Sequence, residues 1–266
     1  MVKKLGLALG SGSFRGYLYV GVFRTLEKYN IKIDYIAGAS AGALAGSYYA
    51  VYGNSKKLEE FFLGSKREKL KFISDINVSR GLIKGDNVEK MVDKHLGGAD
   101  FKDAKIKLAI VATDLNTSDF FVFKRGNIAK AVRASTAVPL LFKPVVHHNT
   151  LLVDGGLSNP VPDNVVREMG ADVVLAVDVY AYENNIKPTD RLSLMKLAYV
   201  SVQVALNNIA EYSTNNADII IRPNVVKFTK ISMYKKYFDK KVADALIKIG
   251  EEETERIIPK LKKLLQ

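Results

Sequence analysis

Residues 1–52 alternate short apolar runs with helical patterns, and this alternation constrains the fold more than any other feature of the chain. The apolar run Leu5–Leu9 and the segment Ile33–Ala37 have the length of buried strands. Each precedes a helical pattern, over Tyr17–Tyr29 and Ala41–Tyr52, and in the first of these the apolar residues recur at helical spacing. Strands that alternate with helices predict an α/β fold with a mainly parallel sheet.

The rest of the chain continues this pattern, and no linker of biased composition interrupts it. With 266 residues, of which 48% are hydrophobic, the chain is long enough for a sizeable core, and we expect one domain over residues 1–266. Asp86 is the expected N-cap of one helix, and Pro259 predicts a kink or break in the last one. Further strands are expected at residues 106–112, 120–124, 151–154, 173–179 and 219–221, and helices at 87–95, 128–133, 163–169, 192–216 and 239–265.

The chain contains no cysteine, which excludes disulfide frameworks, thiolate zinc sites, iron–sulfur clusters and a cysteine nucleophile. A reducing interior fits this composition, so we expect a cytoplasmic location. The apolar run Leu5–Leu9 is too short for a signal peptide. The uncharged stretch Tyr35–Asn54 has about the length of a membrane span. It consists mostly of Gly, Ala, Ser and Tyr, which favours a buried, closely packed helix instead.

Positive charge is concentrated near the C-terminus of a chain whose formal net charge is +12. Residues 222–241 carry seven Lys or Arg against one Asp, and aromatic side chains are interleaved with them. Over Lys227–Lys241 this pattern is compatible with peripheral contact with an anionic membrane. A plain solvated surface is the simpler interpretation. Nucleic acid is not expected as a partner, because no nucleic-acid-binding motif occurs elsewhere in the chain.

The sequence G-A-S-A-G at residues 38–42 has the G-x-S-x-G pattern and stands between a predicted strand and a predicted helix. In that context the pattern forms a nucleophile elbow. The turn is so tight that only small neighbours fit, which accounts for Gly38 and Gly42, and it exposes the serine at the end of the strand. The amide end of the next helix favours negative charge there. Ser40 is the candidate nucleophile, and a small-residue helix start chosen for close packing is the alternative.

A serine nucleophile needs a base, and histidine is scarce in this chain. His95 falls in a polar helix, and His147 and His148 fall in a predicted loop, so each would have to serve out of the usual order, in which the histidine follows the acid. Asp154 ends a predicted strand and precedes Gly155–Gly156, which projects its carboxylate from the sheet edge where α/β sites form. The other interpretation of this Asp-Gly is an ordinary turn.

The third motif is the turn GSGSFRG at residues 10–16, which follows the first strand and opens the first helix. Its small residues allow several backbone N–H groups to converge on one anion. Neither nucleotide-binding pattern fits, because Tyr17 stands where a P-loop has lysine and Arg15 stands where a dinucleotide loop has its third glycine. An oxyanion hole is therefore the better interpretation.

In this order, the glycine-rich loop, G-x-S-x-G and D-G-G resemble the motifs of the patatin-like phospholipases. The resemblance extends to AVRASTAVPLLFKPV at residues 131–145 and DGGLSN at 154–159. It covers approximately residues 5–180 and leaves 181–266 as a C-terminal helical extension with one more strand. The fold that it implies is a three-layer α/β/α sandwich with a mainly parallel central sheet.

The resemblance also implies a role for each matching residue. Ser40 would be the nucleophile and Asp154 the general base of a Ser–Asp dyad that works without histidine. The backbone amides of Gly12 and Ser13 would stabilise the oxyanion, and Arg15 would orient the loop or contact a phosphate. The chain departs from the family in one respect, since Ser11 and Ser13 stand where the loop is usually glycine. A serine at a position that requires positive φ would reshape the hole.

The function implied is hydrolysis of a phospholipid or lysophospholipid ester through an acyl-enzyme, with no metal and no cofactor. Thioester hydrolysis or acyl transfer would use the same residues. A non-catalytic lipid-binding or regulatory protein is the alternative from another class, and the substituted loop leaves it open. The oligomeric state is unknown. An acyl groove and simple core packing are both compatible with a set of apolar residues near the motifs, namely Phe14, Tyr17, Leu140, Leu141 and Phe142.

Overall fold

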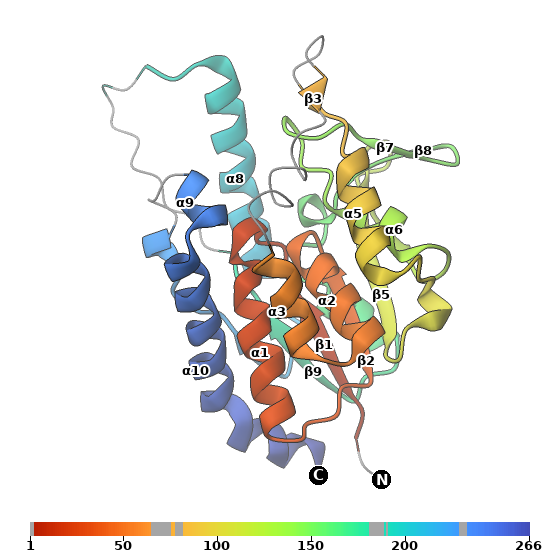
Figure 1. The fold of residues 1–266 in the computed structure, drawn as a ribbon, viewed down its shortest axis with the longest axis vertical. Helices are drawn as coiled ribbons and strands as arrows, with labels where there is room; N and C mark the ends of the chain where they lie inside the picture. Colours follow the sequence, from red (N-terminus) through yellow and green to blue (C-terminus); the bar gives the residue numbers. More distant parts are fainter. Residues whose placement is uncertain (1–2, 65–75, 78–81, 181–188, 190, 229–232) are drawn as a thin grey trace.

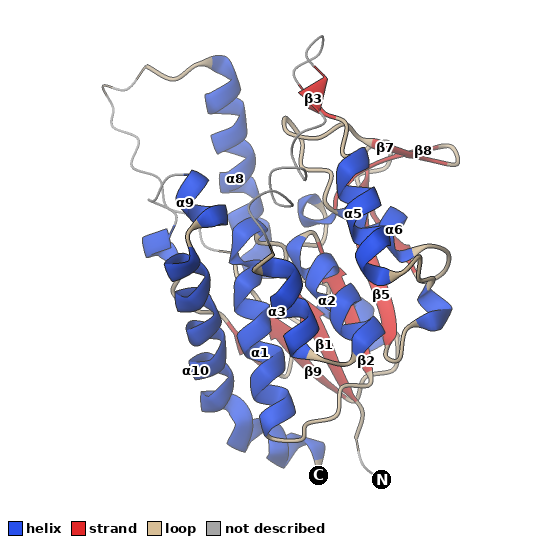
Figure 2. Ribbon diagram, in the orientation of Figure 1, coloured by secondary structure: helices blue, strands red, loops and turns tan. Residues whose placement is uncertain are grey.

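The computed structural model describes residues 3–64, 76–77, 82–180, 189, 191–228 and 233–266, and these form a sheet with helices on both faces (Figure 1, Figure 2). Four strand pairs in the sheet are parallel and three are antiparallel, which confirms the predicted α/β sandwich with a mainly parallel sheet. The parallel strands, in spatial order, are β10 (Ile219–Ile221), β9 (Val173–Val177), β1 (Leu5–Leu9), β2 (Tyr35–Ala39) and β5 (Lys107–Asp114). The strands that run antiparallel to their partners at the β5 end are β6 (Phe120–Phe123), β8 (Thr150–Asp154) and β7 (Val145–His147).

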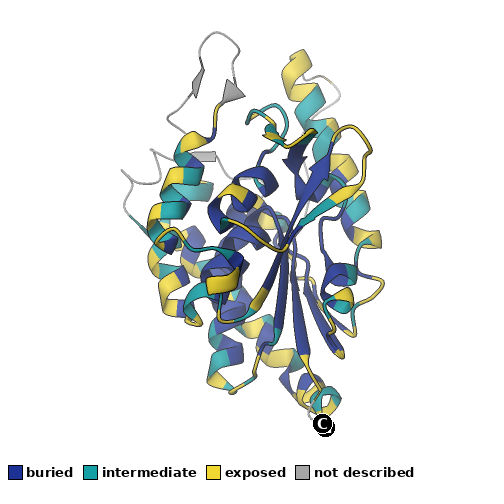
Figure 3. Cartoon of the chain, turned by 90° about the vertical axis from the view of Figure 1, so that its right-hand side faces the viewer, coloured by how far each residue is buried: buried dark blue, intermediate teal, exposed yellow. Residues whose placement is uncertain are grey.

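Alternate residues of the central strands pack on opposite faces of the sheet, as the pleat requires. Leu5, Leu7 and Leu9 join a buried cluster with α1 (Tyr17–Lys28), α2 (Ala41–Tyr52) and α10 (Lys240–Leu265). Ala8 and the alanines of β2 face α7 (Asp163–Glu168) in a second cluster. The strands are therefore buried on both faces (Figure 3).

Helices α1 and α10 lie side by side although they come from opposite ends of the chain (Figure 1). Their backbones meet at glycines: a Cβ on Gly21 would lie 2.0 Å from the Ile247 carbonyl oxygen, and one on Gly250 would lie 2.2 Å from that of Leu18. The contact ties the C-terminal helix to the first helix of the chain. Helix α10 continues past Pro259 without a break.

The remaining elements differ from the predicted ones in small ways. The helix expected at 87–95 begins at Asp86, and its N-cap is Gly85 rather than Asp86. Both histidines were expected in a loop. His148 lies in the turn as expected, whereas His147 is the last residue of β7 (Val145–His147), which pairs with β8 as a hairpin. The other elements are α3 (Ser55–Phe62), β3 (Ile76–Asn77), β4 (Leu82–Ile83), α5 (Asp86–Leu96), α6 (Ile128–Ser135), α8 (Leu194–Tyr212) and α9 (Met233–Phe238), with short 3-10 turns at Ser13–Gly16 (η1), Phe101–Asp103 (η2), Gly155–Leu157 (η3) and Val226–Phe228 (η4).

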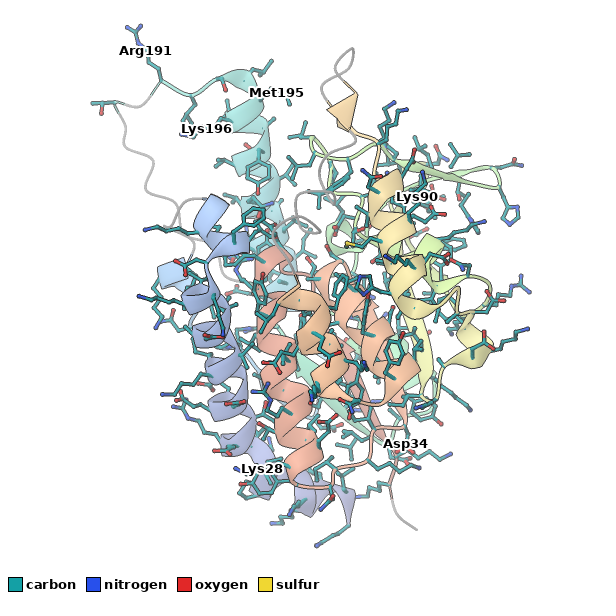
Figure 4. The ribbon with its side chains drawn as sticks, in the orientation of Figure 1. Lys28, Asp34, Lys90, Arg191, Met195 and Lys196 are labelled. Atoms are coloured by element: carbon teal, nitrogen blue, oxygen red, sulfur yellow. The ribbon has the colours of Figure 1, made fainter. Side chains whose placement is uncertain are left out.

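The long helix predicted at 192–216 is α8, and its apolar stripe is largely exposed. Leu194 is 80% exposed and Leu197 50%, whereas Leu206 and Ala210 near the other end are buried. Figure 4 shows Met195 and Lys196 at the outlying end of this helix. Among the described residues, α8 packs on Tyr180 and Leu157 through Val202, Leu206 and Ala210.

The uncharged stretch at residues 35–54 contains β2 and the 12-residue helix α2, whose first ten residues are buried. This confirms the closely packed helix that the small residues predicted. Among the residues that the structure describes, no helix combines the length and the apolar character needed to cross a bilayer.

Candidate active site

Ser40 stands alone between β2 and α2, in a backbone conformation that few L-residues adopt. Its φ is 51° and its ψ is −115°, a strained combination. The neighbouring glycines allow the turn: a Cβ on Gly38 would lie 2.4 Å from the Gly42 carbonyl oxygen, and a Cβ on Gly42 would lie 2.0 Å from that of Leu9. Both contacts are with backbone, so neither position accepts a larger residue without a shift of the main chain.

The hydroxyl of Ser40 donates a hydrogen bond of 2.6 Å to Oδ2 of Asp154. The register of β5 explains why these residues meet across 114 positions of sequence. Strand β2 ends with Ala39 opposite Val111, and β8 ends with Asp154 opposite Ala112, the next residue of β5. Strand β6 occupies the other edge of β5, so β2 and β8 share one edge. Because β2 runs parallel to β5 and β8 runs antiparallel to it, the carboxyl ends of β2 and β8 face each other.

The Asp154 carboxylate is buried and has a partner for each oxygen. Oδ1 accepts a 2.8 Å hydrogen bond from the Gly156 amide, and Oδ2 accepts the bond from Ser40. Burial raises the pKa of Asp154 to about 6, and the two hydrogen bonds oppose that rise. A Cβ on Gly155 would lie 2.1 Å from the Val111 carbonyl oxygen, so this glycine lets the chain turn tightly against β5.

Two further hydroxyl groups fix the backbones of this pair, and the sequence analysis did not single out either of them. The Ser135 hydroxyl accepts from the Ser40 amide at 2.8 Å and donates to the Val111 carbonyl at 2.6 Å. The Thr113 hydroxyl donates to the Asp154 carbonyl at 2.8 Å. Ser135 falls within the segment 131–145 that carried the family resemblance, and Thr113 had no such signal.

The loop after β1 packs against both halves of this pair. A Cβ on Gly42 would lie 2.8 Å from the Gly10 carbonyl oxygen, and a Cβ on Gly156 would lie 2.6 Å from the Ser11 hydroxyl. The Ser11 amide donates to the Pro160 carbonyl at 2.7 Å, which joins the loop to the segment after Asp154. The structure thus brings all three predicted motifs to the carboxyl ends of β1, β2 and β8.

Within this loop, the Gly12 and Ser13 amides donate no hydrogen bond to any residue that the structure describes. Ser13 has a φ of 56°, in the left-handed region that glycine favours, whereas Gly12 at 179° is extended. Arg15 is buried, and its guanidinium donates a 3.1 Å hydrogen bond back to the Gly12 carbonyl. Desolvation lowers the pKa of Arg15. Of the two predicted roles for Arg15, this contact corresponds to orienting the loop.

The three histidines have other surroundings. His147 and His148 contact each other, and His147 packs on Phe121 and Phe123. His95 packs on Tyr48 and Phe61. Within the described part of the chain, no histidine hydrogen-bonds to Ser40, and no group of three or more His, Asp or Glu side chains is arranged to hold a metal ion.

A parallel sheet with a serine elbow at the carboxyl end of one strand is a layout found among hydrolytic enzymes. Comparison with known proteins narrows this class. The family model described as patatin-like phospholipase matches residues 7–165. The chain belongs to this family, as the motifs predicted.

Curated relatives agree with that assignment, and one solved structure shares the fold. An uncharacterised NTE family protein of Mycobacterium tuberculosis is 32% identical over 184 residues, which cover 68% of this chain and 50% of that protein. The lysophospholipase NTE1 of Coccidioides immitis is 30% identical over 191 residues, covering 69% of this chain and 12% of the fungal protein. VipD of Legionella pneumophila shares the fold at 15% identity and a TM-score of 0.59, over 100% of this chain and 67% of VipD.

The chain spans about half the length of the mycobacterial relative. The family description, patatin-like phospholipase, supports a lipid ester hydrolase.

Proposed function

We propose that this chain hydrolyses carboxylic esters of lipids, with Ser40 as the nucleophile and Asp154 as the general base. The observation that carries the proposal is the 2.6 Å hydrogen bond from the Ser40 hydroxyl to a buried carboxylate. A carboxylate with the ordinary pKa of about 3.9 is a poor base for a serine hydroxyl. Burial raises the pKa of Asp154 to about 6, which makes this carboxylate a stronger base that is still ionised at neutral pH.

The reaction proceeds in two halves. The Ser40 oxygen attacks the ester carbonyl carbon while its proton passes to Asp154. The C–O bond to the alcohol then breaks, and Asp154 returns the proton to the leaving oxygen. A water molecule attacks the acyl-enzyme and gives a proton to Asp154, which passes it back to Ser40 as the fatty acid leaves.

The negative charge of each tetrahedral intermediate needs donors, and the Gly12 and Ser13 amides are the candidates. They belong to the loop that packs on the elbow, and they make no hydrogen bond to a described protein group. Arg15 holds the Gly12 carbonyl and so orients this peptide. Donors positioned in advance stabilise the transition state more than the bound ester.

The proposed substrate is a phospholipid or lysophospholipid, the class that the family and the fungal relative's name suggest. Of the apolar residues considered for an acyl groove, Phe14 and Tyr17 are buried in the main core, which favours a packing role. Leu141 is partly exposed in the turn after α6. Leu140–Phe142 is therefore the better candidate for contact with an acyl chain.

Contact with an anionic membrane through Lys227–Lys241 stays a prediction, as does a cytoplasmic location. Residues 229–232 of this segment lie outside the described residues. Lys227, Lys235 and Lys240 are exposed, whereas Phe228 is buried and Tyr237 packs on the core. Sedimentation with vesicles of zwitterionic or anionic phospholipid tests this contact.

The proposed dyad is tested with a fluorophosphonate probe, which labels an activated serine, and with hydrolysis of a water-soluble nitrophenyl ester. We expect Ser40→Ala to abolish both signals and Asp154→Asn to slow both by at least about 1,000-fold. Ser201→Ala and Asp244→Asn, at exposed positions on α8 and α10, are the matched controls and should behave as wild type.

Three outcomes would contradict parts of the proposal. A folded wild type that neither labels nor hydrolyses would favour the non-catalytic lipid-binding protein. Labelling unchanged in Asp154→Asn would show that Asp154 is not the base, and His147 and His148 would then be the candidates. Hydrolysis of thioesters, or transfer to an added alcohol, faster than hydrolysis of lipid esters would keep the dyad and change the reaction.

A further inference from the structure

Ser13 holds a backbone conformation that its residue type disfavours. Its φ of 56° lies in the left-handed region, where the Cβ of an L-residue crowds the carbonyl oxygen. Glycine takes this conformation without that crowding. Because Ser13 also supplies one of the proposed oxyanion amides, an interaction that stabilises this turn also stabilises the site.

Tyr237 of α9 makes such an interaction. Its hydroxyl hydrogen-bonds with the hydroxyl of Ser13, 224 positions earlier in the sequence. The Tyr237 backbone carbonyl accepts a 3.0 Å hydrogen bond from the Tyr17 hydroxyl, so a residue of α1 fixes the main chain of this tyrosine. The ring of Tyr237 is partly buried against the main core. Its hydroxyl is therefore presented to the loop from a fixed position.

The residues on either side of this bond reinforce it. The Phe14 ring meets the Tyr237 ring edge-on, with centroids 6.1 Å apart. The Lys236 ammonium lies 5.3 Å from the centroid of the same Phe14 ring. On the other side of Ser13, Arg15 holds the Gly12 carbonyl. The loop is thus held by its own arginine and by two consecutive residues of the basic segment near the C-terminus.

We propose that Tyr237 is a positioning residue for the oxyanion loop. Its hydroxyl holds the Ser13 side chain and, through it, the left-handed turn that directs the Ser13 amide at the ester oxygen. The inference rests on the proposed function and extends it, because it gives the C-terminal part of the chain, beyond the family match at 7–165, a role in the acyl-transfer step. It also explains how a serine replaces the usual glycine here.

The test measures kcat and KM on a water-soluble nitrophenyl ester. Complete loss of one oxyanion donor costs about 100- to 1,000-fold in kcat, and a displaced donor costs less. We expect Tyr237→Phe to lower kcat by about tenfold and to change KM by less than about twofold, because the oxyanion forms only in the transition state. Ser13→Ala, which keeps the Cβ and removes the hydroxyl, should show the same loss.

Adding Ser13→Gly to Tyr237→Phe should recover most of the lost kcat, because glycine holds the turn without support. Tyr212→Phe, at a 75% exposed tyrosine on α8, is the matched control and should leave both constants unchanged.

The inference is overturned if Tyr237→Phe melts at a lower temperature but keeps its kcat, because the bond would then only anchor α9. It is also overturned if adding Ser13→Gly to Tyr237→Phe does not restore kcat. Should Tyr237→Phe fail to fold, the comparison of Ser13→Ala with Ser13→Gly decides, and equal kcat values would count against the proposal. Hydrolysis that survives in Ser40→Ala would instead show that the proposed function itself is wrong.

Discussion

Two serines at the carboxyl ends of neighbouring strands share a strained backbone and differ in what holds it. Ser40 follows β2 with a φ of 51°, and Ser13 follows β1 with a φ of 56°. The turn at Ser40 is made possible by glycines two residues away on either side, where a Cβ would meet backbone atoms. The turn at Ser13 has the hydroxyl of Tyr237, which lies 224 positions away, as its side-chain partner.

This difference separates two ways of stabilising a conformation that most residues avoid. Close backbone approach excludes alternatives through steric repulsion, which is strong and local. A single hydrogen bond between hydroxyl groups contributes about 1 kcal/mol, comparable with the cost of the left-handed conformation. The turn at Ser40 is therefore enforced by the close packing of β1, β2 and α2 and by the Ser135 hydroxyl, whereas the turn at Ser13 depends on α9 being in place.

The largest expected effect comes from breaking the local support of Ser40. In Gly42→Ala the new Cβ would lie 2.0 Å from the Leu9 carbonyl oxygen, so β1 and α2 must separate. We expect a loss of about 3 kcal/mol or more in the free energy of unfolding, measured by denaturant titration, and at least about a 100-fold loss of kcat/KM.

Gly46→Ala in the same helix is the control. Its Cβ would lie 2.8 Å from the Ile36 Cγ2, a side-chain atom that can move, and the helix gains from alanine. The change in its unfolding free energy should stay within about 1 kcal/mol. Equal losses in the two variants would contradict the steric account of the turn at Ser40.

The partner of Ser40 adds a second expected effect, which is on stability. Burial raises the pKa of Asp154 to about 6 in the folded state, above its ordinary value of 3.8, so the folded state binds more protons than the unfolded state between these values. The free energy of unfolding therefore falls as the pH rises through this window, by about 3 kcal/mol for a shift of about two units. Asp154→Asn removes this cost, and we expect it to be more stable than wild type by up to about 3 kcal/mol at pH 8.

The same comparison at pH 4 should show a difference of less than about 1 kcal/mol, because the carboxyl group is then protonated in the folded state and close to half protonated in the unfolded state. Thermal or denaturant unfolding of both proteins at the two pH values measures the effect. Asp244→Asn, at an exposed position of α10, is the matched control and should show no such pH-dependent gain. An Asp154→Asn variant that is less stable than wild type at pH 8 would contradict the desolvation account.

The pH dependence of hydrolysis gives a smaller effect that separates the two serines. The proposed base, Asp154, must be ionised to accept the Ser40 proton, and burial raises its pKa to about 6. We expect kcat/KM to be level above this pH and to fall about tenfold for each unit below it. Tyr237→Phe should lower the whole profile without moving its midpoint, because the role proposed for Tyr237 is to position the loop after β1 and not the base. A midpoint that moves with Tyr237→Phe would assign the tyrosine to the base instead.

The distinction between support from neighbours in sequence and support from distant contacts also explains what the sequence could predict. The G-x-S-x-G turn and the helix over Ala41–Tyr52 depend on neighbours in sequence, and the structure has both as expected. The meeting of Ser40 and Asp154 depends on the register of β5, where adjacent residues pair with the ends of β2 and β8. Motif order and strand ends indicated that edge of the sheet, but no spacing in the sequence specifies the register.

Features that depend on distant contacts were missed or misplaced. The β7 strand exists through its pairing with β8, and its three residues are too few to give a pattern of their own. The charge pattern between residues 222 and 241 gave no sign that Phe228 is buried or that Tyr237 contacts Ser13 in the loop after β1. The apolar residues of the helix predicted at 192–216 do not share one environment, since Leu194 is 80% exposed whereas Leu206 and Ala210 are buried against Tyr180.

The smallest expected effect isolates the backbone cost at Ser13 from the hydrogen bond. Ser13→Ala and Ser13→Gly both remove the hydroxyl that contacts Tyr237, and they differ in whether a Cβ must occupy a φ of 56°. Ser13→Gly should therefore be the more stable variant by about 1 kcal/mol in chemical denaturation. The control is the same pair of substitutions at Ser201, which lies exposed within α8. Glycine is a poorer helix former than alanine, so Ser201→Gly should be less stable than Ser201→Ala by about 1 kcal/mol. The same sign at both positions would mean that the left-handed turn at Ser13 is absent in solution, and with it the reason for Tyr237 to hold the loop.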